Sequence, residues 1–200
     1  DGRLDIQALE RLIDERTKIL AVTQVSNVLG IVNPIDEIVR ICHSKGVPVL
    51  VDGAQGIVHC GIDVRKTDCD FYAFSGHKMY AATGTGVLYG KKEYLEKMPP
   101  FLFGGEMVGN VSLEQTTFAP LPMKFEAGTQ NFIGQTSFIQ AIEFMRSLDD
   151  QELASECRTV EQAMRNILTQ NPRIKLYGTA EPKIPVFSFS VDGLHHEDLA

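Results

Sequence analysis

The sequence predicts an α/β domain in layers, with a mostly parallel sheet and helices on both faces. Strand-like and helix-like segments alternate between residues 5 and 89, as in layered α/β domains. The segment 47–52, VPVLVD, is a continuous apolar run that ends in an acid. Such runs are typical of strands buried on both faces of a parallel sheet.

The elements follow from residue patterns along the chain. Apolar residues at helical spacing predict helices over 5–16, 132–148 and 151–169. Short apolar or β-rich runs predict strands at 18–25, 47–52, 71–75, 86–89 and 184–191. A further helix should begin with Asn33 as N-cap and Pro34 in the first helical position, and stop at Lys45-Gly46.

Residues 99–128 show no periodicity, and we expect a long loop there of the kind that is usually functional. The segment LDDQE near residue 149 is the expected domain boundary. Residues 1–149 would then form part of a large domain, and residues 150–200 would begin a small α+β domain.

Composition excludes several classes of function. The net charge of −7 gives no electrostatic support for nucleic-acid binding. The apolar runs are too short to cross a membrane, and no signal peptide is visible. The four cysteines form no CxxC pair and no zinc pattern, so we expect no metal site, and reduced thiols in a cytoplasmic protein.

Polar side chains follow three successive predicted strands. They are Asn27, Asp52, Gln55, Ser75, His77 and Lys78. Ligands of open α/β sheets bind beyond the carboxyl ends of the strands. Singly, such residues are often an N-cap, a structural histidine or a surface lysine. Together, a lysine flanked by serine and histidine suits a phosphate-bearing aldehyde that forms a Schiff base with the amine.

The glycines of Gly84-Thr85-Gly86 precede a strand rather than linking a strand to a helix. They predict a turn and not a dinucleotide-binding loop.

Five motifs carry a resemblance to a known family: VSNVLG, VDGAQ, FSGHKMYAATGTGVLYGKK, FGGEMV and FEAGTQN. They resemble the class V aminotransferase-fold proteins, most closely the SUF-type cysteine desulfurases and selenocysteine lyases. The resemblance covers nearly the whole chain. It implies the large domain of a type I PLP-dependent transferase, with pyridoxal 5'-phosphate (PLP) as cofactor.

The resemblance also implies a role for each motif residue. Lys78 matches the Schiff-base lysine, Asp52 the partner of the pyridine nitrogen, and Gln55 the donor to the phenolic oxygen. Ser75 and His77 match phosphate ligands. Asn27 matches a residue that helps to hold the substrate carboxylate, and Thr129 one that reaches the phosphate of the neighbouring subunit of a homodimer, with Gly104–Met107 as an interface loop.

The activity implied is removal of sulfur from L-cysteine, giving L-alanine and an enzyme persulfide for iron–sulfur cluster assembly or another sulfur-acceptor protein. L-selenocysteine is an alternative substrate. Another class V lyase or transaminase, or a non-catalytic domain with the same fold, remains an alternative.

The chain also departs from the family pattern. Ala81-Ala82 stands where Gly-Pro is common, and Gln130 where proline is common. The family's ring-stacking histidine and a phosphate loop lie upstream of Asp1. Its sulfur-accepting cysteine and substrate-clamping arginine lie beyond Ala200, and none of the four cysteines here matches. His195-His196 resembles the segment before that cysteine. We therefore expect an internal fragment that is inactive alone.

Overall fold

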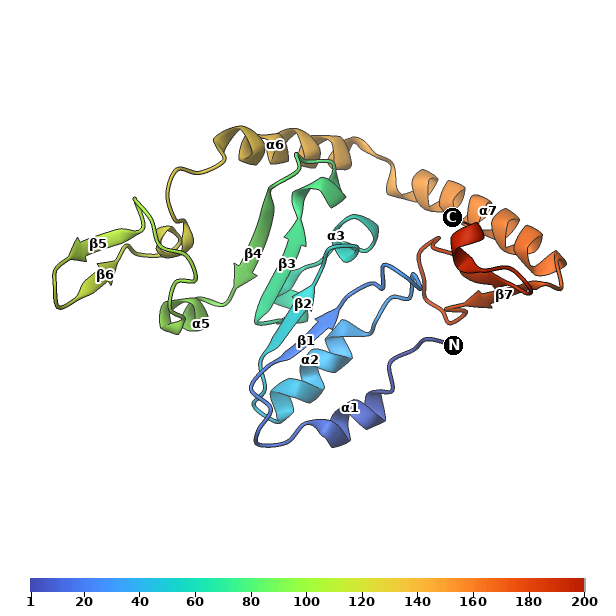
Figure 1. Cartoon of the computed structure of the whole chain (residues 1–200), viewed down its shortest axis with the longest axis horizontal. Helices are drawn as coiled ribbons and strands as arrows, with labels where there is room; N and C mark the ends of the chain where they lie inside the picture. The colour runs from blue at the N-terminus through green and yellow to red at the C-terminus, as the bar shows by residue number, and fades with distance from the viewer. Residues whose placement is uncertain (200) are drawn as a thin grey trace.

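A four-stranded sheet forms the centre of the computed structural model, which describes residues 1–199 (Figure 1). The strands run in the order β1 (Leu20–Thr23), β2 (Val49–Asp52), β3 (Phe71–Ser75) and β4 (Gly86–Gly90). The first three strands are parallel and β4 pairs antiparallel with β3. The predicted α/β class with a mostly parallel sheet is confirmed.

The helices connect and flank these strands. They are α1 (Ile6–Leu12), α2 (Ile35–Ser44), α3 (Gly56–His59), α4 (Val64–Thr67), α5 (Lys92–Lys97), α6 (Phe132–Ser147) and α7 (Asp150–Gln170). Short 3₁₀ turns are η1 (Gly76–Met79), η2 (Met123–Phe125) and η3 (His196–Asp198). Two hairpins lie outside the central sheet: β5 (Val108–Val111) with β6 (Thr116–Phe118), and β7 (Ile174–Tyr177) with β8 (Ser188–Val191).

The core lies between one face of the sheet and helices α1 and α2. Val49, Val51 and Tyr72 point to this face, and all three are almost completely buried. The apolar stripe of α2, including Ile38 and Cys42, packs against them. The other face is contacted by α5, whose Tyr94 ring lies 5.5 Å from that of Phe71.

The start of α2 differs from the prediction. The helix begins at Ile35, Pro34 is its N-cap, and no side chain caps it. Asn33 is buried, and its side-chain amide donates to the carbonyl of Thr23 at 2.8 Å. The prediction of Asn33 as N-cap is wrong because this side chain instead satisfies the end of β1.

The first helix ends four residues earlier than predicted, at Leu12. Asp14 accepts hydrogen bonds from the backbone and guanidinium of Arg16 and so forms a local turn. Acidic side chains that bond to nearby backbone groups compete with helix continuation.

Residues 99–128 are not a loop throughout, since they contain the β5–β6 hairpin and η2. Both strands are largely exposed, so no buried face imposes an alternating pattern on the sequence. Near the C-terminus, the predicted strand 184–191 shortens to β8, and its partner β7 was not predicted.

Helices α6 and α7 are separated at Leu148 and Asp149. Asp149 is the N-cap of α7 and accepts from the backbone N–H groups of Gln151 and Glu152. This break coincides with the expected domain boundary, which stays a prediction. Within residues 1–199, no helix is both long and apolar enough to cross a membrane.

Candidate active site

The ends of two adjacent parallel strands bring most of the predicted site together. Asp52 ends β2 and pairs with Ala73 of β3, and Ser75 ends β3. Gln55 is the N-cap of α3. The turn η1, which carries His77 and Lys78 and follows β3 directly, packs against α3. Five of the seven predicted site residues thus gather at one edge of the sheet.

The turn after β2 is held by backbone hydrogen bonds. The carbonyl of Asp52 accepts from the N–H of Gln24 at 2.8 Å, and the N–H of Gly53 donates to the carbonyl of Ala73 at 2.8 Å. One carboxylate oxygen of Asp52 accepts from the N–H of Ala54 at 2.9 Å. The carboxylate is therefore oriented by its own turn, while its second oxygen stays available.

The turn that carries Lys78 is held by Thr85, the residue that precedes β4. Gly76 is buried, and its N–H donates to the carbonyl of Thr85 at 2.8 Å. A Cβ at Gly76 would come within 2.4 Å of the Thr85 hydroxyl, so this position requires glycine. Met79, the next residue after Lys78, is buried, whereas the side chain of Lys78 is exposed.

A second brace comes from α6. The hydroxyl of Ser137 accepts from the N–H of Ala82 at 2.8 Å. Family members often have proline at the position of Ala82, and proline has no N–H to donate. The N–H of Ala82 thus makes possible a hydrogen bond between the end of the lysine turn and α6 that a proline at this position could not make.

Four of the five site side chains at this edge have no hydrogen-bond or ion-pair partner in the described part of the protein. Among residues 1–199, the side chains of Gln55, Ser75, His77 and Lys78 make no hydrogen bond or ion pair. An amine, a carboxylate, and several hydrogen-bond donors are thus presented together. This set matches an aldehyde cofactor with a ring nitrogen and a phosphate, so the residues fit PLP.

Two predicted residues are less closely connected to this edge. Asn27 is exposed in a turn closed by hydrogen bonds between Ser26 and Ile31 and between Gly30 and Ser26, both 2.9 Å. Thr129 follows Gly128, in the segment between η2 and α6, which lies on the β4 side of the sheet (Figure 1). Thr129 is exposed, and within residues 1–199 no hydrogen bond joins its side chain to the residues that follow β2 and β3. The roles of both residues stay predictions.

The sequence did not predict the roles of three residues near this edge: Gln24, Tyr72 and Ser137. Gln24 is 7% exposed and Tyr72 is 1% exposed. Gln24 is a polar residue within the run AVTQV, and a polar residue at such a position could have indicated a buried hydrogen bond. No local pattern indicated that Ser137 would reach the lysine turn from α6.

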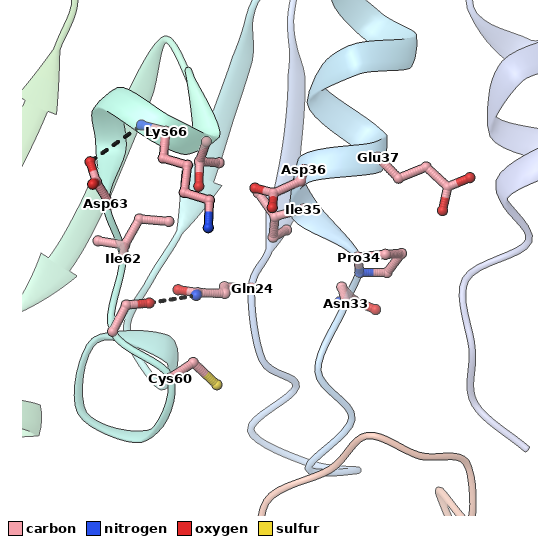
Figure 2. Close-up of a pocket in the computed structure, with 12 residues that line it drawn as sticks. Gln24, Asn33, Pro34, Ile35, Asp36, Glu37, Cys60, Ile62, Asp63 and Lys66 are labelled. Atoms are coloured by element: carbon pink, nitrogen blue, oxygen red, sulfur yellow. Dashed lines mark hydrogen bonds between the residues drawn. The ribbon is translucent and has the colours of Figure 1, made fainter. Parts of the chain in front are cut away.

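Two cavities lie outside the predicted site. One, of about 660 Å³, is lined by the start of α2 and the loops around α4, including Gln24, Asp36, Cys60 and Asp63 (Figure 2). The other, of about 1020 Å³, lies among α3, α6, α7 and the segment before β8. Neither cavity is lined by a predicted site residue, so the site is defined by the strand ends. Among residues 1–199, no group of three or more His, Cys, Asp or Glu could hold a metal ion.

Comparisons with known proteins show which family the chain belongs to. The sequence model of the aminotransferase class-V family matches residues 1–200. A cysteine desulfurase of Dickeya dadantii is 48% identical over 198 residues, covering 98% of this chain and 47% of its own length. The chain spans about half the length of the curated relatives that it matches.

Solved structures show the same relation. The cysteine desulfurase CsdA of Escherichia coli superposes with a TM-score of 0.90 at 40% identity, over 98% of this chain and 48% of that one. A C-DES mutant with glycine covalently linked to its PLP cofactor superposes with a TM-score of 0.84 at 25% identity, over 100% of this chain and 54% of that one. The chain belongs to the aminotransferase class V family.

Proposed function

We propose that the protein containing this chain is a PLP-dependent cysteine desulfurase that converts L-cysteine into L-alanine and an enzyme-bound persulfide. The observation that carries the proposal is the exposed side chain of Lys78 in η1, the turn that follows β3 directly, with Asp52 at the end of the adjacent parallel strand β2. Relatives named cysteine desulfurase at 42–48% identity support this choice of reaction.

Each residue at the edge of the sheet has a distinct task in this proposal. Lys78 would hold PLP through its aldehyde carbon, and its amine would serve as acid and base for the proton at the substrate Cα. Asp52 keeps the ring nitrogen protonated, and Gln55 donates to the phenolic oxygen. Ser75 and His77 donate to the phosphate. When bound, PLP supplies an electron-accepting ring.

The proposal extends to residues further from this edge. Asn27 helps to hold the substrate carboxylate, and Thr129 reaches the phosphate of the second subunit of a homodimer. Thr129 is exposed, as a contact across a subunit interface requires. Selenocysteine as substrate, iron–sulfur assembly, a sulfur-acceptor protein and a cytoplasmic location belong to the same proposal.

The sulfur-accepting thiol must be accessible and able to ionise. Cys42 and Cys69 are both completely buried, and burial raises the pKa of each thiol. Cys60 and Cys157 are exposed, but neither matches the position of the acceptor cysteine that the family resemblance implies. We propose that the acceptor is a cysteine outside residues 1–200, and that this chain alone releases no sulfur from cysteine.

The test is alanine production from L-cysteine by the full-length protein loaded with PLP. Replacing Lys78 with alanine removes the proton-transfer group and should slow turnover by roughly 10²–10⁴-fold. The matched control is Lys97→Ala, because Lys97 is also exposed but lies at the end of α5. A Lys78→Ala enzyme as active as Lys97→Ala would overturn the proposal. Transamination without release of sulfur would point to another class V reaction.

A further inference from the structure

A buried polar pair, Gln24 and Tyr72, lies beneath the turn that carries Asp52 and Gln55. The Tyr72 hydroxyl donates to the side-chain oxygen of Gln24 at 2.7 Å. The side-chain nitrogen of Gln24 donates to the carbonyl of Gly61 at 2.9 Å (Figure 2). Buried polar groups with every partner in place rigidify their surroundings. The pair is therefore fixed at both ends.

This pair contacts the site turn at two points and the start of α3 at a third. The backbone N–H of Gln24 donates to the carbonyl of Asp52 at 2.8 Å. Gly53 lies so close to Tyr72 that an added Cβ would be 2.0 Å from the ring atom Cζ. An added Cβ at Gly56, the first residue of α3, would be 1.9 Å from the side-chain oxygen of Gln24. The ring of Tyr72 thus lies directly against the turn, and the side chain of Gln24 lies against the helix that continues it.

The side chains of the pair and the side chain of Asp52 point to opposite faces of the sheet. Val51 pairs with Tyr72 and Asp52 pairs with Ala73, so Tyr72 and Asp52 point to opposite faces. Tyr72 therefore does not lie on the face where a ligand would meet the Asp52 side chain, and its contact with the turn is the route by which it can affect the position of Asp52.

We infer that Gln24 and Tyr72 are positioning residues that fix the Asp52–Gln55 turn and so set how the carboxylate and the amide meet the PLP ring. The inference rests on the proposed function, because it concerns the same site. Its physical basis is that site residues need rigid support from the residues behind them to keep a productive geometry.

The hydroxyl of Tyr72 is a permanent donor in this arrangement. Burial is the largest cause that raises the pKa of Tyr72 well above its ordinary value. The side-chain oxygen of Gln24 can only accept a hydrogen bond, so the Tyr72 hydroxyl is the donor.

The test compares Tyr72→Phe with a matched control, Tyr89→Phe, in the full-length protein. Tyr89 of β4 pairs with Tyr72 in the sheet, and its hydroxyl makes no hydrogen bond within residues 1–199. Both variants lose one hydroxyl from adjacent strands, but only Tyr72→Phe leaves the oxygen of Gln24 without its donor. Three quantities are measured: the dissociation constant of PLP, the circular dichroism that the bound cofactor acquires from its surroundings, and the urea unfolding of the cofactor-free protein.

We expect Tyr72→Phe to bind PLP roughly 10-fold more weakly, in the range found when partners behind a ligating residue are removed. The induced dichroism should decrease as well, because a loosely held ring lies in a less defined asymmetric environment. Tyr89→Phe should retain wild-type values of both. Equal PLP affinity and dichroism in the two variants, with only the unfolding midpoint lowered in Tyr72→Phe, would show a purely structural pair and overturn the inference.

A second variant approaches the pair from its other member. Gln24→Met should weaken PLP binding to a similar extent. The double variant should bind PLP no more weakly than the single variant that binds it more weakly, because both changes break the same hydrogen bond. Additive losses would contradict the inference, even if Tyr72→Phe folds poorly. Wild-type protein that fails to attach PLP at Lys78 would overturn the proposed function as well. Normal attachment with unaffected variants would overturn the positioning role alone.

Discussion

Replacing Gly53 with alanine should separate the stability of the fold from the geometry of the site. An added Cβ would lie 2.0 Å from Tyr72 Cζ, whereas ordinary contact begins at 3.4 Å, so about 1.4 Å of movement is needed. Tyr72 cannot easily move, because it is buried and bonded to Gln24. The turn with Asp52 must shift instead. Overpacking of this kind typically costs about 1–3 kcal/mol of stability.

The matched control is Gly46→Ala, which should cost a similar free energy for a different reason. Gly46 has no neighbour within 4 Å of an added Cβ, but its φ is +70°. A non-glycine residue in this left-handed conformation costs about 1–2 kcal/mol. Gly46 follows α2, outside the predicted site.

The two variants are compared by urea unfolding and by turnover of L-cysteine in the full-length protein. Both should unfold at lower urea than the wild type. Only Gly53→Ala should lose activity, by roughly 100-fold, since a misplacement of about 1 Å has that effect on a positioned group. Activity of Gly53→Ala equal to that of Gly46→Ala would refute the reasoning that the turn geometry is critical.

Three further predictions concern pH, the lysine turn and assembly. Burial alone would raise the pKa of the buried Asp70 carboxyl, but hydrogen bonds, led by that from His43, hold it below its usual value. The ionised Asp70 should therefore stabilise the fold fully above about pH 4, and this stabilisation should be lost as the pH falls through the pKa of Asp70 in the folded protein. Urea unfolding between about pH 3 and 6 should show this loss in the wild type but not in Asp70→Asn. A pH profile of Asp70→Asn identical to that of the wild type would contradict the prediction. Ser137→Ala, which removes the acceptor for the Ala82 N–H, should cost about 1 kcal/mol and weaken PLP retention, whereas Ser137→Thr should restore both; equal retention in all three proteins would count against a brace. Light scattering should find the full-length protein to be a dimer, and an active monomer would disprove the interface role of Thr129.

The central sheet was predictable because its strands have local signals. The run VPVLV is apolar because β2 is buried, and the acid that follows marks the strand end at Asp52. Ser75, His77 and Lys78 could likewise be placed after a strand. Parallel pairing then brings these ends together, as the register between β2 and β3 confirms.

The features that escaped prediction depend on contacts between distant segments. The side chain of Asn33 does not cap α2 because Thr23, ten residues earlier, takes its hydrogen bond. The β5–β6 hairpin is exposed, so burial imposes no alternation on it. Tyr72 and Gln24 meet across 48 positions in sequence, and no local pattern reports such a meeting.

The identity of the lysine that carries PLP tests the account most directly. The full-length, PLP-loaded protein is reduced with borohydride, digested with trypsin and mapped by mass spectrometry. The chain has ten lysines, and a modified Lys78 would block cleavage, giving one labelled peptide over residues 67–91 in place of separate peptides 67–78 and 79–91. We predict that labelled peptide. A label on any other lysine, or an active enzyme with no label, would contradict the account.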